Sequence, residues 1–420
     1  MAISIRKAVV EKAQAAKEAS KKLAYLSTEV KNRALSRIAS QIEEKEEEIL
    51  VANREDVQGA KGKGLSPAMI DRLLLDHFRI KAMANGVQDV VALPDPVGEI
   101  INMWKRPNGL LIGKMRVPIG VIGFIYEARP NATVDAAVLG LKAGNAVILR
   151  GGSEAFHSNL MLTKIIDQAA GQEGIPAGAI QFIDVTDHQA VKEMLKLNEY
   201  IDLIIPRGGE GLIRTVVEEA KVPVIFHYKG NCHIYVDRDA DLAMAENIAF
   251  NAKVQRPAVC NAMETLLVNE EIAPRFLPGM IARFQEAGVE IRGCEKTRAW
   301  IPKIKEATAE DWEEEYLSLI LAVKVVEDLD EAIQHINRYT SGLAEAIITD
   351  CYSSAQRFLQ EVDSAVVYVN ASTRLTDGNQ FGLGAEIGIS TQKLHARGPM
   401  GLVELTTYKY IVYGSGQIRE

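Results

Sequence analysis

The sequence predicts an α/β protein with two doubly wound α/β domains and a small β arm. Short apolar runs rich in Val and Ile alternate with helical stretches in two consecutive series. Such runs are typical of parallel strands that are buried on both faces of a sheet. The length of 420 residues also exceeds the size at which single hydrophobic cores stop growing, which favours two domains.

The N-terminal part is predicted to be helical. Over residues 5–58 the apolar positions recur every four residues, as they do from Val30 to Ile42, while the acidic run EEKEEE forms a solvated face. After a break at 59–64, Ser66 followed by Pro67 predicts a new helix, because a hydroxyl can cap the first turn and proline is tolerated within it.

The first strand series follows this helical part. Continuous apolar runs separated by helical stretches indicate a parallel sheet with helices on its faces. The predicted strands are VIGFIY (121–126), AVILR (146–150), IQFID (180–184), IDLIIP (201–206) and PVIFHY (223–228).

A second series of the same kind predicts a second α/β domain that begins near Lys229. Helical stretches such as DLAMAENIAFNAK and CYSSAQRFLQEV separate its strands. The predicted strands are CHIYVD (232–237), TLLV (265–268), VEIRG (289–293), LSLILAVKVV (317–326), AEAIITD (344–350) and SAVVYVN (364–370).

Two further segments predict assembly with another subunit. Residues 110–117 have the pattern of an extended arm, and LTTYKYIVYG (405–414) alternates like a strand that has no evident partner in its own chain. An unpaired strand and a protruding arm both need partners, so we expect a homo-oligomer.

Composition excludes several classes of function. The net charge is −8 and no Lys/Arg run is long enough to form a basic stripe, which disfavours a nucleic-acid partner. The four cysteines lack CxxC pairs, so we expect neither a metal site nor a disulfide framework. The N-terminus has no signal-peptide core and charges interrupt every apolar run, so we expect a cytoplasmic protein without a membrane span.

Cys260 is the candidate nucleophile. The segment NAKVQRPAVCNAMETLLV (251–268) places it just before an apolar run, where a thiol can face a cleft while its neighbours are packed. Lys253 and Arg256 lie within two turns upstream, and cations lower the pKa of a nearby thiol and attract an anionic substrate. We therefore predict that Lys253 and Arg256 bind the substrate. The alternative for Cys260 is the commoner role of a free cysteine, a small buried hydrophobic residue.

A glycine cluster follows one of the predicted strands. RGGEG (207–211) comes directly after IDLIIP, but it lacks the GxGxxG spacing of the dinucleotide-binding fingerprint. The residues alone leave two interpretations open, a plain tight turn or a loop that approaches a phosphate.

Seven motifs spread over nearly the whole chain point to a known family. They are EARPNAT (127–133), GNAVILRGGSEA (144–155), IIPRGGEG (204–211), HYKGNCHIYVD (227–237), KVQRPAVCNAMETLLV (253–268), EEEYLSLILAV (313–323) and AEIGISTQKLHARGPMGLVELTTYKY (385–410). Together they resemble the aldehyde dehydrogenase superfamily and, within it, the gamma-glutamyl phosphate reductase family, also called glutamate-5-semialdehyde dehydrogenases.

The resemblance implies a reaction. It is the NADPH-dependent reduction of L-glutamyl 5-phosphate to L-glutamate 5-semialdehyde with release of phosphate, which is the second step of proline biosynthesis. A Cys260 thiolate would attack the acyl carbonyl, and the thioester formed would accept hydride. By family position, the Asn131 amide and the Cys260 main-chain N–H would stabilise the negative oxygen. Without the resemblance, a helix cap is the alternative role for Asn131.

The resemblance also implies the residues that bind NADPH. Arg150 and Ser153 would meet the adenine ribose and could hold its 2′-phosphate. The glycine turn would let the pyrophosphate approach a helix start, and a glutamate of the EEE run would bind the nicotinamide ribose. The implied residues are Arg150, Gly151, Ser153, Glu154, Gly208, Gly209 and Glu315.

The domain boundaries expected from these patterns divide the chain into three parts. They are an NADP-binding domain over 1–228 with 105–118 as a protruding oligomerisation arm, a catalytic domain over 229–390, and a return segment with a C-terminal oligomerisation strand over 391–420. The family also implies functional coupling to glutamate 5-kinase.

Alternatives remain open at this point. Hydrolytic aldehyde dehydrogenases carry an ELGG motif whose glutamate activates water, and His227 stands in its place in HYKGNCHIYVD. A hydrolytic NAD(P)-dependent semialdehyde dehydrogenase is nevertheless the nearest alternative. A cysteine hydrolase with His227 or His233 as base would need no nucleotide, and a ligand-binding scaffold would not need Cys260.

Overall fold

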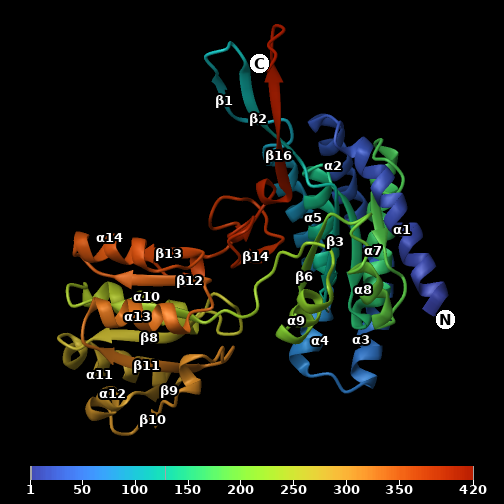
Figure 1. Ribbon diagram of the computed structural model, residues 1–420. Coiled ribbons are helices and arrows are strands. Elements are labelled where there is room, and N and C mark those ends of the chain that lie inside the picture. Colours follow the sequence, from blue (N-terminus) through green and yellow to red (C-terminus); the bar gives the residue numbers. More distant parts are fainter. Residues whose placement is uncertain (1, 128, 420) are drawn as a thin grey trace. The chain divides into compact units, whose positions relative to one another are not determined.

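The computed structural model describes residues 2–127 and 129–419, which form two compact units (Figure 1). The first unit comprises Met1–Phe226, Gly382–Gly388 and Met400–Glu420, and the second comprises His227–Phe381 and Ile389–Pro399. The stretch 391–420, expected as one segment, is thus divided between the two units. Within the described residues, no helix is both long enough and apolar enough to span a membrane.

The N-terminal part is helical as predicted, but the helix expected to run from Ser66 through residues 69–90 is divided into two, of which the first ends at Leu73 and the second begins at His77. Its helices begin where the sequence provides caps: Ser27 Oγ accepts from Val30 N, and Ser66 Oγ accepts from Met69 N directly before Pro67. The third helix extends to Gly62, into the predicted break. The elements are α1 (Ala2–Leu23), α2 (Thr28–Glu44), α3 (Glu46–Gly62), α4 (Pro67–Leu73) and α5 (His77–Ala92).

The first unit is built on a four-stranded parallel sheet with the order β5-β4-β3-β6. Its strands are β3 (Val121–Tyr126), β4 (Ala146–Gly151), β5 (Ile180–Phe182) and β6 (Leu203–Arg207). All six residues of β3 are buried, as predicted for a central parallel strand. The accompanying helices are α6 (Pro130–Lys142), α7 (Phe156–Gln172), α8 (His188–Met194) and α9 (Glu210–Glu219), with the 3-10 turn η1 (Ser153–Ala155).

The strand predicted at 223–228 is wrong. This segment makes only an isolated bridge, between Val224 and Ile204. The chain turns into the second unit directly afterwards, at His227.

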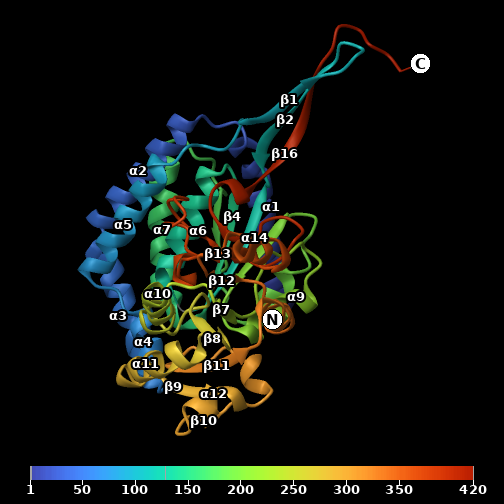
Figure 2. The same cartoon turned by 90° about the vertical axis from the view of Figure 1, so that its left-hand side faces the viewer.

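An antiparallel sheet of three strands, β1 (Ile100–Lys105), β2 (Leu111–Pro118) and β16 (Thr406–Tyr413), extends away from the rest of the first unit in both views (Figures 1 and 2). The expectation that the C-terminal strand lacks a partner in its own chain is wrong. β16 pairs with β2 over its whole length, from Thr406 opposite Pro118 to Tyr413 opposite Leu111.

The second unit is built on a seven-stranded parallel sheet with the order β10-β9-β11-β8-β7-β12-β13. All six strands predicted for the second series are present. The elements are β7 (Cys232–Val236), α10 (Leu242–Val254), β8 (Met263–Asn269), α11 (Ala273–Glu286), β9 (Glu290–Gly293), α12 (Glu295–Trp300), β10 (Lys305–Glu306), η2 (Glu310–Trp312), β11 (Ile320–Val326), α13 (Leu329–Tyr339), β12 (Ala344–Ile348), α14 (Tyr352–Glu361), β13 (Val366–Val369) and η3 (Thr373–Leu375). The chain ends with β14 (Gly388–Ser390), β15 (Gly398–Met400), η4 (Val403–Leu405) and β16.

Both faces of this sheet are covered by helices. On β7, Ile234 and Val236 belong to the core formed with α10 and α11, whereas Tyr235 belongs to the core formed with α13 and α14. Successive side chains of a strand point to opposite faces, so the apolar run packs on both sides. Because both faces of the sheet are covered, a ligand can reach this sheet at the ends of its strands.

Candidate active site

Cys260 lies in the loop 255–262, which joins the end of α10 to the start of β8. Its side chain is partly exposed. The loop stands at the amino end of a fully buried strand, so the thiol is accessible while the segment that follows it is packed, as a nucleophile requires.

Gly230 brings two of the predicted residues together. A Cβ on Gly230 would lie 1.8 Å from the Cys260 carbonyl oxygen, so only glycine allows this approach. The Gly230 N–H donates to Glu315 Oε1 at 2.8 Å. The predicted nicotinamide-ribose residue and the predicted nucleophile therefore meet at one glycine that sequence reasoning did not single out.

Cys232 also contacts the Cys260 loop. Its side chain is fully buried, and its Sγ donates to the Cys260 carbonyl oxygen at 3.3 Å. Burial, reinforced by the charge of Glu345, raises the pKa of Cys232 well above its ordinary value. Cys232 is thus a protonated donor that holds the loop.

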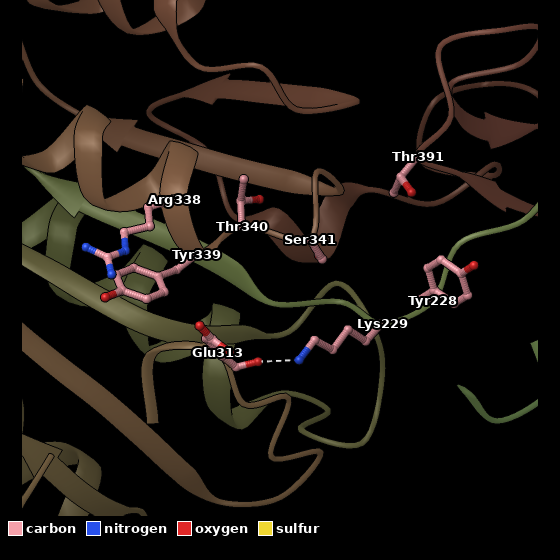
Figure 3. A pocket seen from close by; sticks show the side chains of 8 residues that line it. All are labelled: Tyr228, Lys229, Glu313, Arg338, Tyr339, Thr340, Ser341 and Thr391. Carbon is pink, nitrogen blue, oxygen red and sulfur yellow. Dashed lines mark hydrogen bonds between the residues drawn. The ribbon is translucent and has the colours of Figure 1, made fainter. Parts of the chain in front are cut away.

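A pocket of about 260 Å³ lies in the second unit, and Lys229, the residue before Gly230, is part of its lining (Figure 3). Lys229 reaches across it, and its Nζ donates to the Glu313 carbonyl oxygen. The lining residues are Tyr228, Lys229, Glu313, Arg338, Tyr339, Thr340, Ser341 and Thr391. None of the predicted site residues lines this pocket. Two of its lining residues are near Gly230 and Glu315 in the sequence, namely Lys229 and Glu313.

Lys253 does not face the substrate as predicted. It is fully buried and forms an ion pair with Glu264, which is also fully buried. Glu264 in turn accepts from Leu317 N at 3.2 Å. Burial lowers the pKa of Lys253 and raises that of Glu264 to about 7. The ion pair joins the last turn of α10 to β8, the two elements that the Cys260 loop connects, so Lys253 positions this loop. Arg256, by contrast, is exposed on the loop itself.

The two histidines considered as alternative bases differ in accessibility. His233 is fully buried on β7, where its ring Nδ1 lies 3.1 Å from Glu345 Oε2. His227 is partly buried, and its Nδ1 donates to the Ile389 carbonyl oxygen at 3.0 Å. The burial of His233 disfavours a cysteine hydrolase that uses it as a base.

Asn131 lies near the start of α6 in the first unit. Arg129 occupies the N-cap position, so Asn131 is not the helix cap. The exposed Asn131 donates from Nδ2 to Asp135 Oδ2 at 3.4 Å, one turn further along. Burial raises the pKa of Asp135 to about 6, against the opposing effects of Arg207 and Asn131. The amide thus presents a donor whose orientation Asp135 helps to fix.

Arg150 points into the first unit. Only 6% of its surface is exposed, and its guanidinium donates to the carbonyl oxygens of Gly151 (2.7 Å) and Thr186 (2.9 Å). Burial lowers its pKa. These contacts fasten the carboxyl end of β4, whereas Ser153, which donates to Glu154 at 3.3 Å, is exposed at the same end.

The Gly208–Gly209 turn lies between β6 and the start of α9. The Gly209 N–H donates to Glu127 Oε2 at 3.0 Å, and a Cβ on Gly208 would lie 2.6 Å from the Glu127 carboxyl carbon. A carboxylate at a helix N-terminus marks a position that suits an anion. The turn lies where strand order reverses between β3 and β6, and such points commonly hold nucleotides. These residues therefore fit a dinucleotide.

Comparison with known proteins identifies the family of the chain. The sequence model of the aldehyde dehydrogenase family matches residues 3–314 and 301–409. Gamma-glutamyl phosphate reductase of Thermodesulfovibrio yellowstonii is 60% identical over 418 residues, which cover 100% of both chains. The protein of the same name from Carboxydothermus hydrogenoformans is 63% identical over 411 residues, which cover 98% of this chain and 99% of that one.

Solved structures agree with the predicted fold class. The crystal structure of gamma-glutamyl phosphate reductase from Thermotoga maritima has a TM-score of 0.97 at 51% identity and covers 98% of this chain and 100% of that chain. A glyceraldehyde-3-phosphate dehydrogenase from Methanocaldococcus jannaschii, solved with NADP, shares the fold with a TM-score of 0.68 at 18% identity, covering 98% of this chain and 95% of its own. The prediction of two α/β domains of aldehyde dehydrogenase type with a small β arm is confirmed. The chain belongs to the aldehyde dehydrogenase family and, within it, to the gamma-glutamyl phosphate reductases.

Proposed function

We propose that this protein uses NADPH to reduce L-glutamyl 5-phosphate to L-glutamate 5-semialdehyde with release of phosphate, the second step of proline biosynthesis. The observation that carries the proposal is the partly exposed thiol of Cys260, in a loop held by Gly230 and Cys232. Full-length identity of about 60% to proteins named for this reaction supports the same substrate. The hydrolytic alternative is not favoured, because His227 replaces its water-activating glutamate.

The residues account for the chemistry step by step. The Cys260 thiolate attacks the acyl carbon, the bond from that carbon to the phosphate oxygen breaks, and phosphate leaves with the bonding electrons. NADPH supplies the hydride that reduces the resulting thioester. We propose that the Cys260 main-chain N–H stabilises the negative oxygen before the aldehyde leaves and the thiolate is restored. Asn131 remains the second donor that its family position implies.

The nucleotide is proposed to bind at the strand ends of the first unit. Gly208 and Gly209 give the pyrophosphate access to the start of α9. Gly151, Ser153 and Glu154 lie at the end of β4, where the adenine ribose is proposed to bind, and the buried Arg150 keeps this strand end in place. Glu315 is proposed to bind the nicotinamide ribose hydroxyls.

The reverse reaction tests the proposal directly. With L-glutamate 5-semialdehyde and NADP⁺, nucleotide reduction measured at 340 nm is expected to require inorganic phosphate and to yield the acyl phosphate. Rapid reduction without phosphate, with free glutamate as the product, would instead establish the hydrolytic alternative. A coupled assay with glutamate 5-kinase would then test whether the two enzymes pass the labile acyl phosphate between them.

His227 gives a prediction about product partition. Replacing His227 by Glu is expected to increase the share of glutamate over semialdehyde formed from the acyl phosphate, because a carboxylate there can activate water against the thioester. Chromatographic separation of the two products from one reaction measures the share. His227→Gln is the matched control, since it also removes the Nδ1 bond to Ile389 but adds no base; an equal rise in glutamate for both variants would refute the explanation.

The three-stranded sheet supports the proposal of a homo-oligomer. β1 and β16 are its two edges, and exposed apolar side chains lie along β16, including Tyr410 (57% exposed) and Val412 (55%). Unpaired edges with apolar side chains are suited to another subunit.

Deleting residues 406–420 is therefore expected to yield monomers or aggregates, because it removes one of the three strands. Light scattering on purified protein measures the mass. Deleting only 415–420, beyond the end of β16, is the control and is expected to keep the native mass. An unchanged oligomer after the longer deletion would contradict the assignment of this sheet to assembly.

A further inference from the structure

The residue that follows the nucleophile is anchored to a distant segment of the second unit, residues 372–376. The Asn261 side-chain amide donates to the Thr376 carbonyl oxygen at 2.8 Å, and the Asn261 main-chain carbonyl oxygen accepts from Thr373 Oγ1 at 2.8 Å. All three residues are buried. The 372–376 segment is therefore fixed against the Cys260 loop.

Arg374 lies at the centre of this segment. Its Nε donates to Gln255 Oε1 at 3.0 Å and its Nη1 donates to Asn261 Oδ1. The guanidinium thus spans the Cys260 loop between its first residue and the residue after the nucleophile. Among the described residues Nη2 makes no hydrogen bond. The Arg374 guanidinium is thus held in position by Nε and Nη1, while its Nη2 can still donate to a ligand.

Arg256 adds a second positive charge to the same loop, because it directly follows Gln255, which accepts from Arg374 Nε. Burial is the main cause that lowers the pKa of Arg374; the nearby Arg256 lowers it further, while Cys260 and Asp377 oppose this. Within the described residues, neither guanidinium forms an ion pair with a carboxylate. Two neighbouring arginines that form no ion pair repel each other, and an anion between them relieves this repulsion.

We propose that Arg374, together with Arg256, binds the phosphoryl group of the acyl phosphate beside Cys260. This inference rests on the function proposed above and adds the residues that recognise the leaving group. The phosphoryl group is attached to the carbon that the thiolate attacks, whereas the α-carboxylate lies at the other end of the substrate. A guanidinium fastened to the residue next to Cys260 is therefore suited to the phosphoryl group.

The two arginines would promote the step in which the thioester forms. As the thiolate bonds to the acyl carbon, the carbon–oxygen bond to phosphate breaks and negative charge accumulates on the departing oxygen. Guanidinium donors fixed beside that oxygen stabilise the charge without having to reorganise. In the reverse direction the same donors hold inorganic phosphate for its attack on the thioester.

Substitution of Arg374 tests the proposal through phosphate. Arg374→Gln is expected to raise the KM for inorganic phosphate, measured with the semialdehyde and NADP⁺, by roughly 10- to 100-fold, which is the effect of losing a hydrogen bond to a charged group. Arg374→Lys is expected to recover part of this loss, because it keeps the charge without the planar fork. The KM values for NADP⁺ and the semialdehyde are expected to stay within a few-fold.

A second readout needs no turnover. Inorganic phosphate is expected to slow alkylation of Cys260 by iodoacetamide, followed by mass spectrometry, and Arg374→Gln is expected to raise the half-protecting phosphate concentration by a similar factor. Thr373→Val is the matched control, because it removes another hydrogen bond of the same segment and leaves the charge. It is expected to keep phosphate protection within a few-fold of wild type.

The outcomes separate the inference from the proposed function. An unchanged phosphate response in Arg374→Gln, an equal loss in Thr373→Val, or a change in the semialdehyde KM alone would each overturn the assignment of Arg374 to phosphate. If wild-type enzyme reduced NADP⁺ without any need for phosphate, the proposed function would fail. The alkylation experiment would still decide in that case whether Arg374 and Arg256 form a phosphate site.

Discussion

Replacement of Cys260 by alanine is expected to abolish turnover, by at least about 1,000-fold in kcat, while NADPH affinity stays within a few-fold. The thiol forms the covalent bond to the acyl group, and no other side chain in the loop 255–262 is a nucleophile of comparable strength. Initial rates of NADPH oxidation measure the loss, and fluorescence titration measures nucleotide binding. A variant that kept more than a few per cent of wild-type activity would overturn the thioester mechanism.

Cys351 provides the control for this experiment. It is partly exposed at the start of α14, and a hydrogen bond with Ser353 is the main cause that lowers its pKa. It is a partly exposed thiol outside the proposed site, and Cys351→Ala is expected to retain activity. Cys232 cannot serve the same purpose, because its Sγ supports the Cys260 carbonyl oxygen.

All strands of the two parallel sheets except the two-residue β10 (Lys305–Glu306) could be predicted, because parallel strands buried on both faces leave long apolar runs. β7 and β8 are fully buried along their length, so their sequences have no polar alternation that could be confused with a surface strand. The segment 223–228 has the same apolar character, but it forms one bridge and then enters the second unit. Composition alone does not distinguish a paired strand from an apolar connection.

The nucleophile could be predicted from its local sequence, but its surroundings could not. Arg374 bonds to residues 119 and 113 positions away, and only the strand order brings η3 to the Cys260 loop. Gly230 is likewise 30 positions from Cys260 in the sequence. Contacts of this kind leave no local pattern, because they depend on which strands become neighbours.

The burial of Lys253 could have been predicted from the sequence. On α10 the buried positions include Ala245, Ala249 and Ala252, and a residue four positions after Ala249 lies on the same face of a helix. Lys253 occupies that position and is therefore directed into the core, where Glu264 neutralises it. Proximity to Cys260 along the chain suggested a substrate contact, but helical periodicity decided the outcome.

Gly230→Ala is expected to reduce kcat by about 100-fold or more even though no reacting atom is removed. The added Cβ would lie 1.8 Å from the Cys260 carbonyl oxygen and 2.6 Å from its Cα, so the loop or the segment around Gly230 must move. Displacements of about 1 Å at a nucleophile cost on the order of 100-fold in rate. The hydrogen bond from the Gly230 N–H to Glu315 is expected to weaken with the same movement.

Gly279→Ala is the matched control in the same unit. Gly279 lies within α11, and the nearest atom to an added Cβ is Glu246 Oε1 at 3.9 Å. This variant is expected to keep wild-type kcat and to gain up to about 1 kcal/mol in stability, because alanine favours a helix interior over glycine. Initial rates, thermal unfolding and the rate of Cys260 alkylation, measured on both variants, separate a displaced nucleophile from a general loss of folding. Wild-type kcat in folded Gly230→Ala protein would show that the loop tolerates the displacement, and the contact between Gly230 and Cys260 would then have no part in catalysis.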